Sequence, residues 1–310
     1  MFAARPSAKV NLTLEVGPLG DDGYHALRSI FLRIGLADRI GLGLIDGVGD
    51  QLAVDGLPGA PLDENIVLRA LALLRERAGI ALPPVEIELD KRIPVAAGLG
   101  GGSSDAAATL VLAQACWGIG LSSAQQAELA ARLGSDVPFF VAGAPVGLVE
   151  GRGEIVRPLP AVDGEAGLLL VTPRAELSTR AVFARHDALA ARRPGGRGSV
   201  SDDLAAALEE GLTAKELCAW AGRLREANDL WPAAAALEPG LPELREELER
   251  RTDRPWLLSG SGPTLLALYP SPTDAVSGGM SLVDAPADRL ASMLLHATNL
   301  SGPDPAWRHP

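Results

Sequence analysis

Residues 94–109 read PVAAGLGGGSSDAAAT, a glycine-rich turn followed at once by an alanine-rich segment. Glycine accepts positive φ angles and leaves its backbone N–H unobstructed, so Gly98 and residues 100–102 let phosphate oxygens approach closely. The alanine-rich segment predicts a helix over 103–117, with Ser103 or Ser104 as its N-cap. A helix N-terminus carries about half a positive charge and unpaired N–H donors. The turn and the helix together predict an anion-binding site.

The loop differs from two common phosphate-binding signatures. No Lys-Ser or Lys-Thr pair follows the glycines, as a Walker loop requires, and no parallel-strand unit with a distal acid follows, as a dinucleotide fingerprint requires. A flexible turn before a capped helix would explain the same glycines without a ligand. The loop alone therefore leaves both interpretations open.

The sequence on either side of the loop predicts a mixture of strands and helices. Residues 137–143 and 145–151 are predicted as a strand pair, 191–201 as a flexible loop and 299–310 as an unstructured tail. The strands do not alternate regularly with helices, which favours an α+β architecture in two lobes. The glycine- and proline-containing stretch at 151–160 is the predicted crossing between a lobe at 1–157 and a lobe at 158–310. Further strands are predicted at 8–16, 25–34, 38–45, 51–56, 85–94, 167–171 and on both sides of a glycine turn in 256–270, and further helices at 65–78, 123–133, from 178 and over much of 202–250.

Composition narrows the class of protein. The chain has 310 residues, enough for a large buried core, and a net charge of −11, which argues against non-specific nucleic-acid or anionic-membrane binding. No apolar stretch reaches the ~18 residues of a membrane span, and two distant cysteines give neither a disulfide framework nor a metal site, so we expect a cytoplasmic protein. Only three of the 28 basic side chains are lysines, which draws attention to Lys9 and Lys91.

The glycine loop resembles the central motif of the galactokinase, homoserine kinase, mevalonate kinase and phosphomevalonate kinase superfamily. Further segments occur in the same order over roughly residues 5–270: PSAKVNLTLEV, DDGYHALRSIF, ENIVLRA, GSDVPFFVAG, STRAVF, NDL and LSGSGPT. Together they are similar to the branch that phosphorylates a cytidine-diphosphate-linked sugar alcohol in non-mevalonate isoprenoid synthesis. The resemblance implies the two-lobed kinase fold of that superfamily, with the active site in the cleft between the lobes.

Lys9 and Asp136 are the catalytic candidates. Lys9 shares one strand face with Asn11, but a lysine near a chain's start is more often a solvated charge. Asp136 could be only a turn or cap residue. The resemblance implies that Lys9 and Asp136 act together, with Asn11 supporting the pocket. Because phosphoryl transfer is loose, we expect Asp136 to orient the acceptor hydroxyl and take its proton late, while Lys9 stabilises the charged oxygens.

The acceptor site is predicted around Tyr24 and His25. A tyrosine face can stack on a pyrimidine and an imidazole edge can hydrogen-bond its heteroatoms, although hairpin packing would also explain the pair. The resemblance implies a cytosine here, with Phe183 on its other side, where core packing is the alternative for Phe183. The remaining acceptor residues implied are Thr179, Gly260 and Gly262, whose glycine loop is otherwise an ordinary connection between strands.

The resemblance also implies a site for ATP and Mg²⁺. Asn65 and Lys91 would lie near the adenine and ribose, although helix capping explains Asn65 and strand-end solvation explains Lys91 without a ligand. No carboxylate cage for the metal is readable, and Asp105 is interpreted as favouring the helix dipole. The residues implied around the phosphates are Pro94, Gly98, Leu99, Gly100, Gly101, Gly102, Ser103 and Ser104.

Three functions follow from these patterns. The leading one is ATP-dependent phosphorylation of the C2 hydroxyl of the cytidine-diphosphate-linked alcohol. The second is another kinase of the superfamily, of mevalonate or homoserine type, which would need no cytosine pocket. The third is a catalytically silent nucleotide-binding regulator, against which the presence of both Lys9 and Asp136 argues. The expected partners are small molecules, with no nucleic acid or membrane, and the patterns leave the oligomeric state open.

Overall fold

The computed structural model describes residues 1–56, 64–175, 177–190, 199–283 and 294–299. Its helices and its three sheets follow one another without regular βαβ alternation, which confirms the predicted α+β class. The predicted loop at 191–201 lies outside the described residues up to 198, and its last two residues begin helix α6 (Val200–Glu210). The predicted tail lies outside the described residues from 300 onward.

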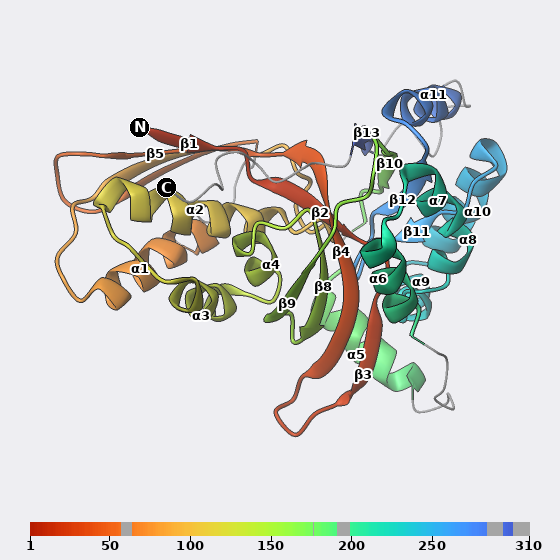
Figure 1. Ribbon diagram of the computed structural model, residues 1–310, viewed down its shortest axis with the longest axis horizontal. Coiled ribbons are helices and arrows are strands. Elements are labelled where there is room, and N and C mark those ends of the chain that lie inside the picture. The colour runs from red at the N-terminus through yellow and green to blue at the C-terminus, as the bar shows by residue number, and fades with distance from the viewer. Residues whose placement is uncertain (57–63, 176, 191–198, 284–293, 300–310) are drawn as a thin grey trace.

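The first sheet has the strand order β1-β5-β7-β6, and helix α2 packs against β1 and β5 (Figure 1). Its last pair, β6 and β7, is parallel. In β7, alternate residues Val85, Ile87 and Leu89 are buried, as expected for a strand with one covered face. The strands are β1 (Phe2–Ala4), β5 (Arg39–Leu44), β6 (Gln51–Asp55) and β7 (Val85–Asp90); the helices beside them are α1 (Ile66–Ala78), α2 (Gly101–Trp117), α3 (Ser123–Leu133) and α4 (Val137–Val141).

The second sheet crosses the middle of the molecule in the order β2-β4-β8-β9 (Figure 1). Its long strand β4 pairs with β2, β3 and β8, and so connects the start of the chain to the region after α4. In the β2–β4 register Lys9 lies opposite Arg33 and Asn11 opposite Phe31. The strands are β2 (Ser7–Asn11), β3 (Glu15–Leu19), β4 (His25–Ala37), β8 (Val146–Gly151) and β9 (Ile155–Leu159).

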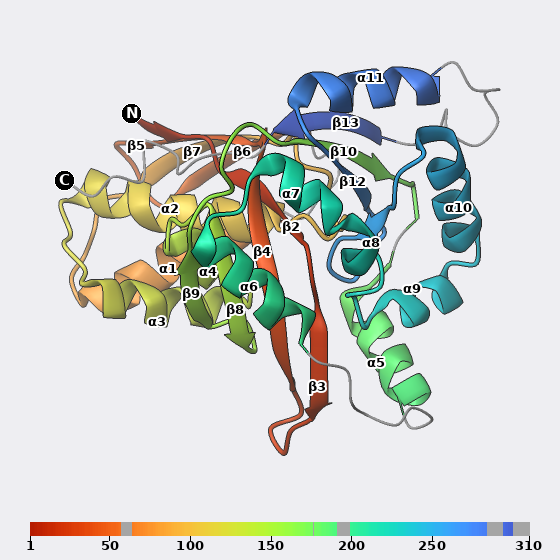
Figure 2. The ribbon, with the colours of Figure 1, turned by 45° about the vertical axis from the view of Figure 1, so that its right-hand side comes forward.

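The third sheet is antiparallel, in the order β11-β12-β10-β13, and α11 packs against β10 and β13 (Figure 2). Every residue of β10 is buried, as its uninterrupted apolar run predicts. The strands are β10 (Gly167–Thr172), β11 (Leu257–Leu258), β12 (Leu265–Tyr269) and β13 (Leu294–Asn299); the remaining helices are α5 (Thr179–Ala190), α6, α7 (Ala214–Ala219), α8 (Ala221–Leu224), α9 (Trp231–Leu237), α10 (Gly240–Thr252) and α11 (Pro272–Val283).

One apolar core joins the second and third sheets. It includes Val10 and Ile30 from the N-terminal half and Leu168 and Leu266 from the C-terminal half, all almost fully buried. The two halves of the chain therefore share a core that fixes β2 relative to the loop between β11 and β12. The division after residue 157 falls within β9 and stays a prediction.

Residues 137–143 are not the predicted strand. Val137–Val141 form the short helix α4, with Pro138 in its first turn, and the chain turns at residues 142 and 143 before β8. A short apolar run has no periodicity that separates a buried strand from a buried helix. Proline is favoured at a helix start, and Val137, Phe139 and Phe140 are all fully buried.

Candidate active site

A cavity of about 1110 Å³ opens where the three sheets meet. It is lined by β2, by the loop before α2, by the turn before α4, by α5 and by the loop between β11 and β12. Of the residues predicted from the sequence, only Ser104 and Gly262 do not line it. Those that do are Lys9, Asn11, Tyr24, His25, Asn65, Lys91, Pro94, Gly98, Leu99, Gly100, Gly101, Gly102, Ser103, Asp136, Thr179, Phe183 and Gly260.

Helix α2 begins inside the glycine loop, earlier than predicted. Its N-cap is Gly100, with φ +70° and no side-chain hydrogen bond, so the predicted cap at Ser103 or Ser104 is wrong. Both serines lie in the first helical turn, where the Ser104 N–H already donates to the Gly100 carbonyl. A glycine cap leaves the first-turn N–H groups without a side-chain acceptor, which suits them to bind an anion.

The glycines of the loop have different physical reasons to be glycine. A Cβ on Gly98 would lie 2.4 Å from the Ser259 carbonyl oxygen, and one on Gly101 would lie 2.9 Å from Ile93. These two positions let the loop pack against its neighbours. A Cβ on Gly102 would make only an ordinary van der Waals contact, 3.8 Å from the Ile66 side chain. Gly102 is therefore where a ligand could use the missing side chain.

Lys9 and Asp136 both line the cavity and face each other, with Lys9 Nζ 3.3 Å from Asp136 Oδ2. The Lys9 side chain is 4% exposed and the Asp136 side chain is 29% exposed, so the carboxylate is the more accessible partner. Asp136 precedes α4 without capping it, which leaves its oxygens available to the cavity. The pair that the sequence placed together by resemblance is thus close in space.

A chain of hydrogen bonds fixes the Lys9 ammonium. Lys9 Nζ donates to Asn11 Oδ1 at 2.7 Å, and Asn11 Nδ2 donates to Ser29 Oγ at 2.9 Å. The Lys9 backbone N–H donates to the Leu99 carbonyl at 2.9 Å, which joins β2 to the glycine loop. The ammonium also lies 4.5 Å from the centre of the Phe31 ring, within cation–π range. Lys9 is therefore held in one place, and it is not the solvated charge of the alternative interpretation.

Lys91 lies between two buried carboxylates under the glycine loop. Its ammonium pairs with Asp38 and, at 2.7 Å, with Asp105. Burial alone would lower the pKa of Lys91, but Asp105 and Asp38 outweigh it and raise that pKa above 10.5. The strand-end solvation interpretation is thus wrong, and Asp105 pairs with Lys91 instead of merely facing the helix dipole.

Asp105 carries the larger electrostatic cost of this cluster. Burial, only partly offset by Lys91, raises the pKa of its carboxyl group from 3.8 to about 7, and the nearby negative charge of Asp38 adds to the rise. One lysine cannot neutralise two buried carboxylates, so one of them holds its proton more tightly. Among the described residues, Asp105 Oδ1 has no hydrogen-bond partner.

Asn65 both caps a helix and lines the cavity. Its Oδ1 accepts from the Val67 N–H at 3.0 Å at the start of α1, which confirms the capping interpretation. Asn65 also lines the cavity, so a contact with the nucleotide stays a prediction.

The predicted acceptor residues gather at the other end of the cavity. The His25 and Phe183 rings stack with centroids 5.7 Å apart, and His25 Nδ1 donates to the Gly17 carbonyl at 2.7 Å. Tyr24 is 57% exposed beside them. Phe183 also packs against the third sheet's core, so the core interpretation of this residue holds as well.

The loop between β11 and β12 closes the site between the two ends. Ser259 Oγ donates to the Gly98 carbonyl at 3.0 Å, and the Thr179 and Ser261 hydroxyls lie 3.0 Å apart. Asn228 Nδ2 donates to the carbonyls of Leu258 and Gly260. Gly262, which does not line the cavity, has φ +86° and would bring a Cβ within 2.9 Å of Leu258. We interpret it as a packing residue.

Sequence reasoning missed several residues of the site. Asp38 was not singled out, although an acid between two apolar segments, as in LADRIG, was a signal for a buried partner. Asn228 was noted only within a family motif. Arg152 and Arg180 line the cavity but were not singled out, although Arg180 lies within the STRAVF segment.

Within the described ranges, no group of three or more histidine, cysteine, aspartate or glutamate side chains could hold a metal ion. In the same part of the chain, no helix is long and apolar enough to cross a membrane. The site can therefore offer backbone N–H groups, a fixed ammonium and an accessible carboxylate, which are the groups that phosphoryl transfer uses.

Comparison with known proteins identifies the family. Residues 65–144 match the GHMP kinases N terminal domain and residues 203–277 match the GHMP kinases C terminal domain. The chain is 37% identical to the 4-diphosphocytidyl-2-C-methyl-D-erythritol kinase of Symbiobacterium thermophilum, over 89% of this chain and 92% of that protein. It is 39% identical to the kinase of the same name from Mycolicibacterium smegmatis, over 91% of this chain and 85% of that one.

Solved structures agree with the sequence relatives. A crystal structure of 4-(cytidine 5'-diphospho)-2C-methyl-D-erythritol kinase matches with a TM-score of 0.74 and 32% identity, over 97% of this chain and all of that one. The mevalonate kinase of L. major matches with a TM-score of 0.71 at 14% identity, over 97% and 96% of the chains, and shows a shared fold. The chain therefore belongs to the GHMP kinase family, in the branch of the 4-diphosphocytidyl-2-C-methyl-D-erythritol kinases.

Proposed function

We propose that the protein uses ATP to phosphorylate the C2 hydroxyl of 4-diphosphocytidyl-2-C-methyl-D-erythritol, giving the 2-phosphate and ADP in non-mevalonate isoprenoid precursor synthesis. The observation that carries the proposal is the Lys9–Asp136 pair, which lines the same cavity as the glycine loop and as Tyr24 and His25. Such a pair is where a phosphate from one side would meet a hydroxyl from the other.

ATP binds on the glycine-loop side in this proposal. The first-turn N–H groups of α2 meet the phosphates, Gly102 gives them room, and the base lies toward Asn65 and Lys91. Mg²⁺ fits this donor set only as an ion carried by the phosphates and water, because no cluster of acidic ligands is found among the described residues. When bound, it neutralises charge on the transferring phosphoryl group.

Asp136 and Lys9 divide the chemistry. The accessible Asp136 carboxylate accepts a hydrogen bond from the acceptor hydroxyl, orients it toward the phosphorus and takes its proton as the new P–O bond forms. Lys9, fixed by Asn11, stabilises the negative oxygens on the transferring group. Because the transition state is loose, positioning matters more than strong deprotonation.

The acceptor's cytosine binds beside Tyr24, His25 and Phe183. Tyr24 offers an exposed ring face for stacking. The His25 ring donates from Nδ1 to the Gly17 carbonyl, and its Nε2 lies 3.0 Å from Asp187 Oδ1, so a hydrogen bond from Nε2 to the base would replace the Asp187 contact. Thr179 and Gly260 line the same cavity, and in this proposal the sugar alcohol lies against them. A kinase for mevalonate or homoserine needs no such aromatic end, and the names of the relatives do not favour those acceptors.

The proposed partners are therefore two small molecules, ATP and the cytidine-diphosphate-linked alcohol. Because the phosphoryl donor is ATP, we propose that the protein works in the cytoplasm.

Product identification tests the proposal. The protein is incubated with ATP, Mg²⁺ and the cytidine-diphosphate-linked alcohol, and phosphorus NMR locates the new phosphate. We expect one phosphate on the tertiary C2 hydroxyl for each ADP formed, and ADP formation that depends on the acceptor. Binding of ATP without product, or equal turnover of mevalonate or homoserine, would contradict it.

A further inference from the structure

The lysines of the cavity are already matched by carboxylates. Lys91 faces Asp38 and Asp105, and Lys9 faces Asp136. A second anionic ligand would therefore find little uncompensated positive charge around these two ammonium groups. The acceptor proposed above carries a diphosphate, so its charge must be met elsewhere in the cavity.

Two arginines that line the cavity have weak carboxylate partners or none among the described residues. Arg180 lies exposed in the first turn of α5 and has no ion pair or hydrogen bond with any described residue. Arg152 lies in the turn between β8 and β9, and its ion pair with Asp22 is 3.5 Å long with both side chains about half exposed. A pair of this kind is worth little in water.

Arg180 also stands where the helix dipole disfavours a cation. The N-terminal turn of a helix carries partial positive charge, so a guanidinium there is favourable only when an anion lies beside it. The described residues supply no carboxylate to Arg180. A bound anion would relieve this local repulsion.

Each arginine adjoins one of the aromatic side chains proposed to hold the base. The Arg152 guanidinium lies 4.8 Å from the centre of the Tyr24 ring. Arg180 precedes Phe183 by three residues on α5, which places both on one helix face, and both line the cavity. In a nucleoside diphosphate the phosphates follow the base by one ribose, so groups beside the base pocket are within reach of them.

We propose that Arg152 and Arg180 form the subsite for the diphosphate of the acceptor, one from each side of the aromatic pocket. The subsite rests on the proposed function, since it presumes a cytidine diphosphate at this end. A guanidinium can bind phosphate oxygens through two parallel hydrogen bonds, which a lysine ammonium cannot. The arginines thus select a diphosphate-linked alcohol over a free alcohol.

Binding of cytidine and CDP separates contacts to the base from contacts to the diphosphate. Affinities of both are measured by calorimetry for wild type, Arg152→Ala, Arg180→Ala and Arg180→Lys, with a non-hydrolysable ATP analogue saturating the other site. Arg185→Ala is the matched control, because Arg185 is exposed on the same helix and does not line the cavity.

We expect each alanine variant to weaken CDP binding about tenfold, with cytidine and the ATP analogue changed less than twofold. Arg180→Lys should fall in between, and Arg185→Ala should match wild type. The CDP loss should shrink as salt rises. These exposed changes should leave the melting temperature unaltered.

Three results would overturn the subsite. If wild type prefers CDP to cytidine and both alanine variants keep that preference, the diphosphate binds elsewhere while the proposed function stands. If the variants lose the ATP analogue instead, the arginines serve the donor phosphates. If wild type binds neither cytidine nor CDP, the proposed function fails, and the subsite with it.

Discussion

The two ends of the cavity are built in opposite ways. At the glycine-loop end the charged side chains are buried and paired, as with Lys91 between Asp38 and Asp105, and backbone N–H groups face the cavity. At the Tyr24 end the ring and the arginines are exposed; Arg152 has only a 3.5 Å ion pair with Asp22, and Arg180 has no ion pair with any described residue. At the glycine-loop end the protein itself supplies the opposite charges, whereas at the Tyr24 end a ligand would supply them.

This difference follows from where each end sits in the fold. The glycine loop is bonded to β2 through Leu99 and to the β11–β12 loop through Ser259, so it is fixed from two sides. The Tyr24 end is assembled from the β3–β4 hairpin, the β8–β9 turn and α5, which extend away from the body of the molecule (Figures 1 and 2). Changes at the first end should therefore affect ATP binding or stability, and changes at the second should affect acceptor recognition alone.

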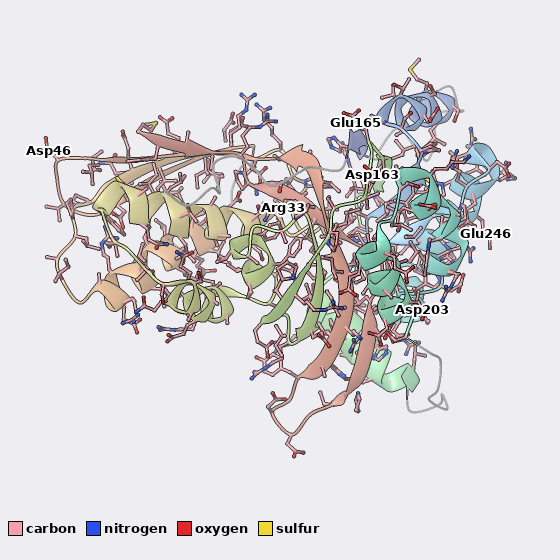
Figure 3. All side chains as sticks on the ribbon, in the orientation of Figure 1. Arg33, Asp46, Asp163, Glu165, Asp203 and Glu246 are labelled. Carbon is pink, nitrogen blue, oxygen red and sulfur yellow. The ribbon has the colours of Figure 1, made fainter. Side chains whose placement is uncertain are left out.

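The catalytic pair lies between the two ends, so its loss should have the largest effect. Asp136→Asn keeps the size of the side chain but cannot take the proton, and we expect single-turnover phosphoryl transfer to fall about 10²–10⁴-fold. Rapid-quench measurement with both substrates saturating checks this. Asp203→Asn, an exposed carboxylate on α6 (Figure 3), is the control. A rate near wild type would remove Asp136 from the mechanism.

Acceptor binding at the Tyr24 end can be weakened without a change in ATP binding at the glycine-loop end. A variant with both Tyr24→Ala and His25→Ala loses the stacking face and the imidazole edge, and we expect the acceptor KM to rise about tenfold or more, with the KM for ATP unchanged. Steady-state kinetics with each substrate varied in turn measures both constants. An unchanged acceptor KM would move the base to another part of the cavity.

Gly102→Ala tests ATP binding at the glycine-loop end. The added methyl group meets no protein atom closer than 3.8 Å but occupies space meant for phosphate, so we expect the KM for ATP to rise several-fold. The melting temperature should hold or increase, because alanine favours a helix by about 1 kcal/mol over glycine. Gly222→Ala in α8 is the control. A normal KM for ATP would show that phosphate does not approach Gly102.

The buried cluster should give a pH-dependent change in stability. The folded-state pKa of Asp105 is raised to about 7, so the folded protein holds this proton more tightly than the unfolded chain. Its contribution to the free energy of unfolding therefore declines as pH rises from about 4 to about 7. Asp105→Asn lacks this decline, so wild type should lose about 1–3 kcal/mol relative to the variant across that range. Urea unfolding at several pH values measures the difference, and a constant difference would contradict the assignment.

The sequence predicted the glycine-loop end better than the Tyr24 end. The glycine turn and the alanine-rich run predicted α2 because they are local patterns, whereas Lys9 and Asp136 came only from the resemblance to the family's motifs. Asp38 was missed because its partner Lys91 is 53 residues away and only the fold brings them together. Arg152 and Arg180 were missed because cavity lining leaves no mark on the sequence. Residues 137–141 were predicted as a strand because a short apolar run fits both structures.

Simultaneous binding of two ligands tests the central claim most directly, namely that one cavity holds ATP at the glycine-loop end and the cytidine diphosphate group at the Tyr24 end. Calorimetry is run with CDP and a non-hydrolysable ATP analogue, each alone and with the other saturating, on wild type, Gly102→Ala and the Tyr24→Ala, His25→Ala double variant. We predict that both ligands bind at once, that Gly102→Ala weakens only the ATP analogue, and that the double variant weakens only CDP. Mutual exclusion of the two ligands, or loss of the same ligand in both variants, would contradict it.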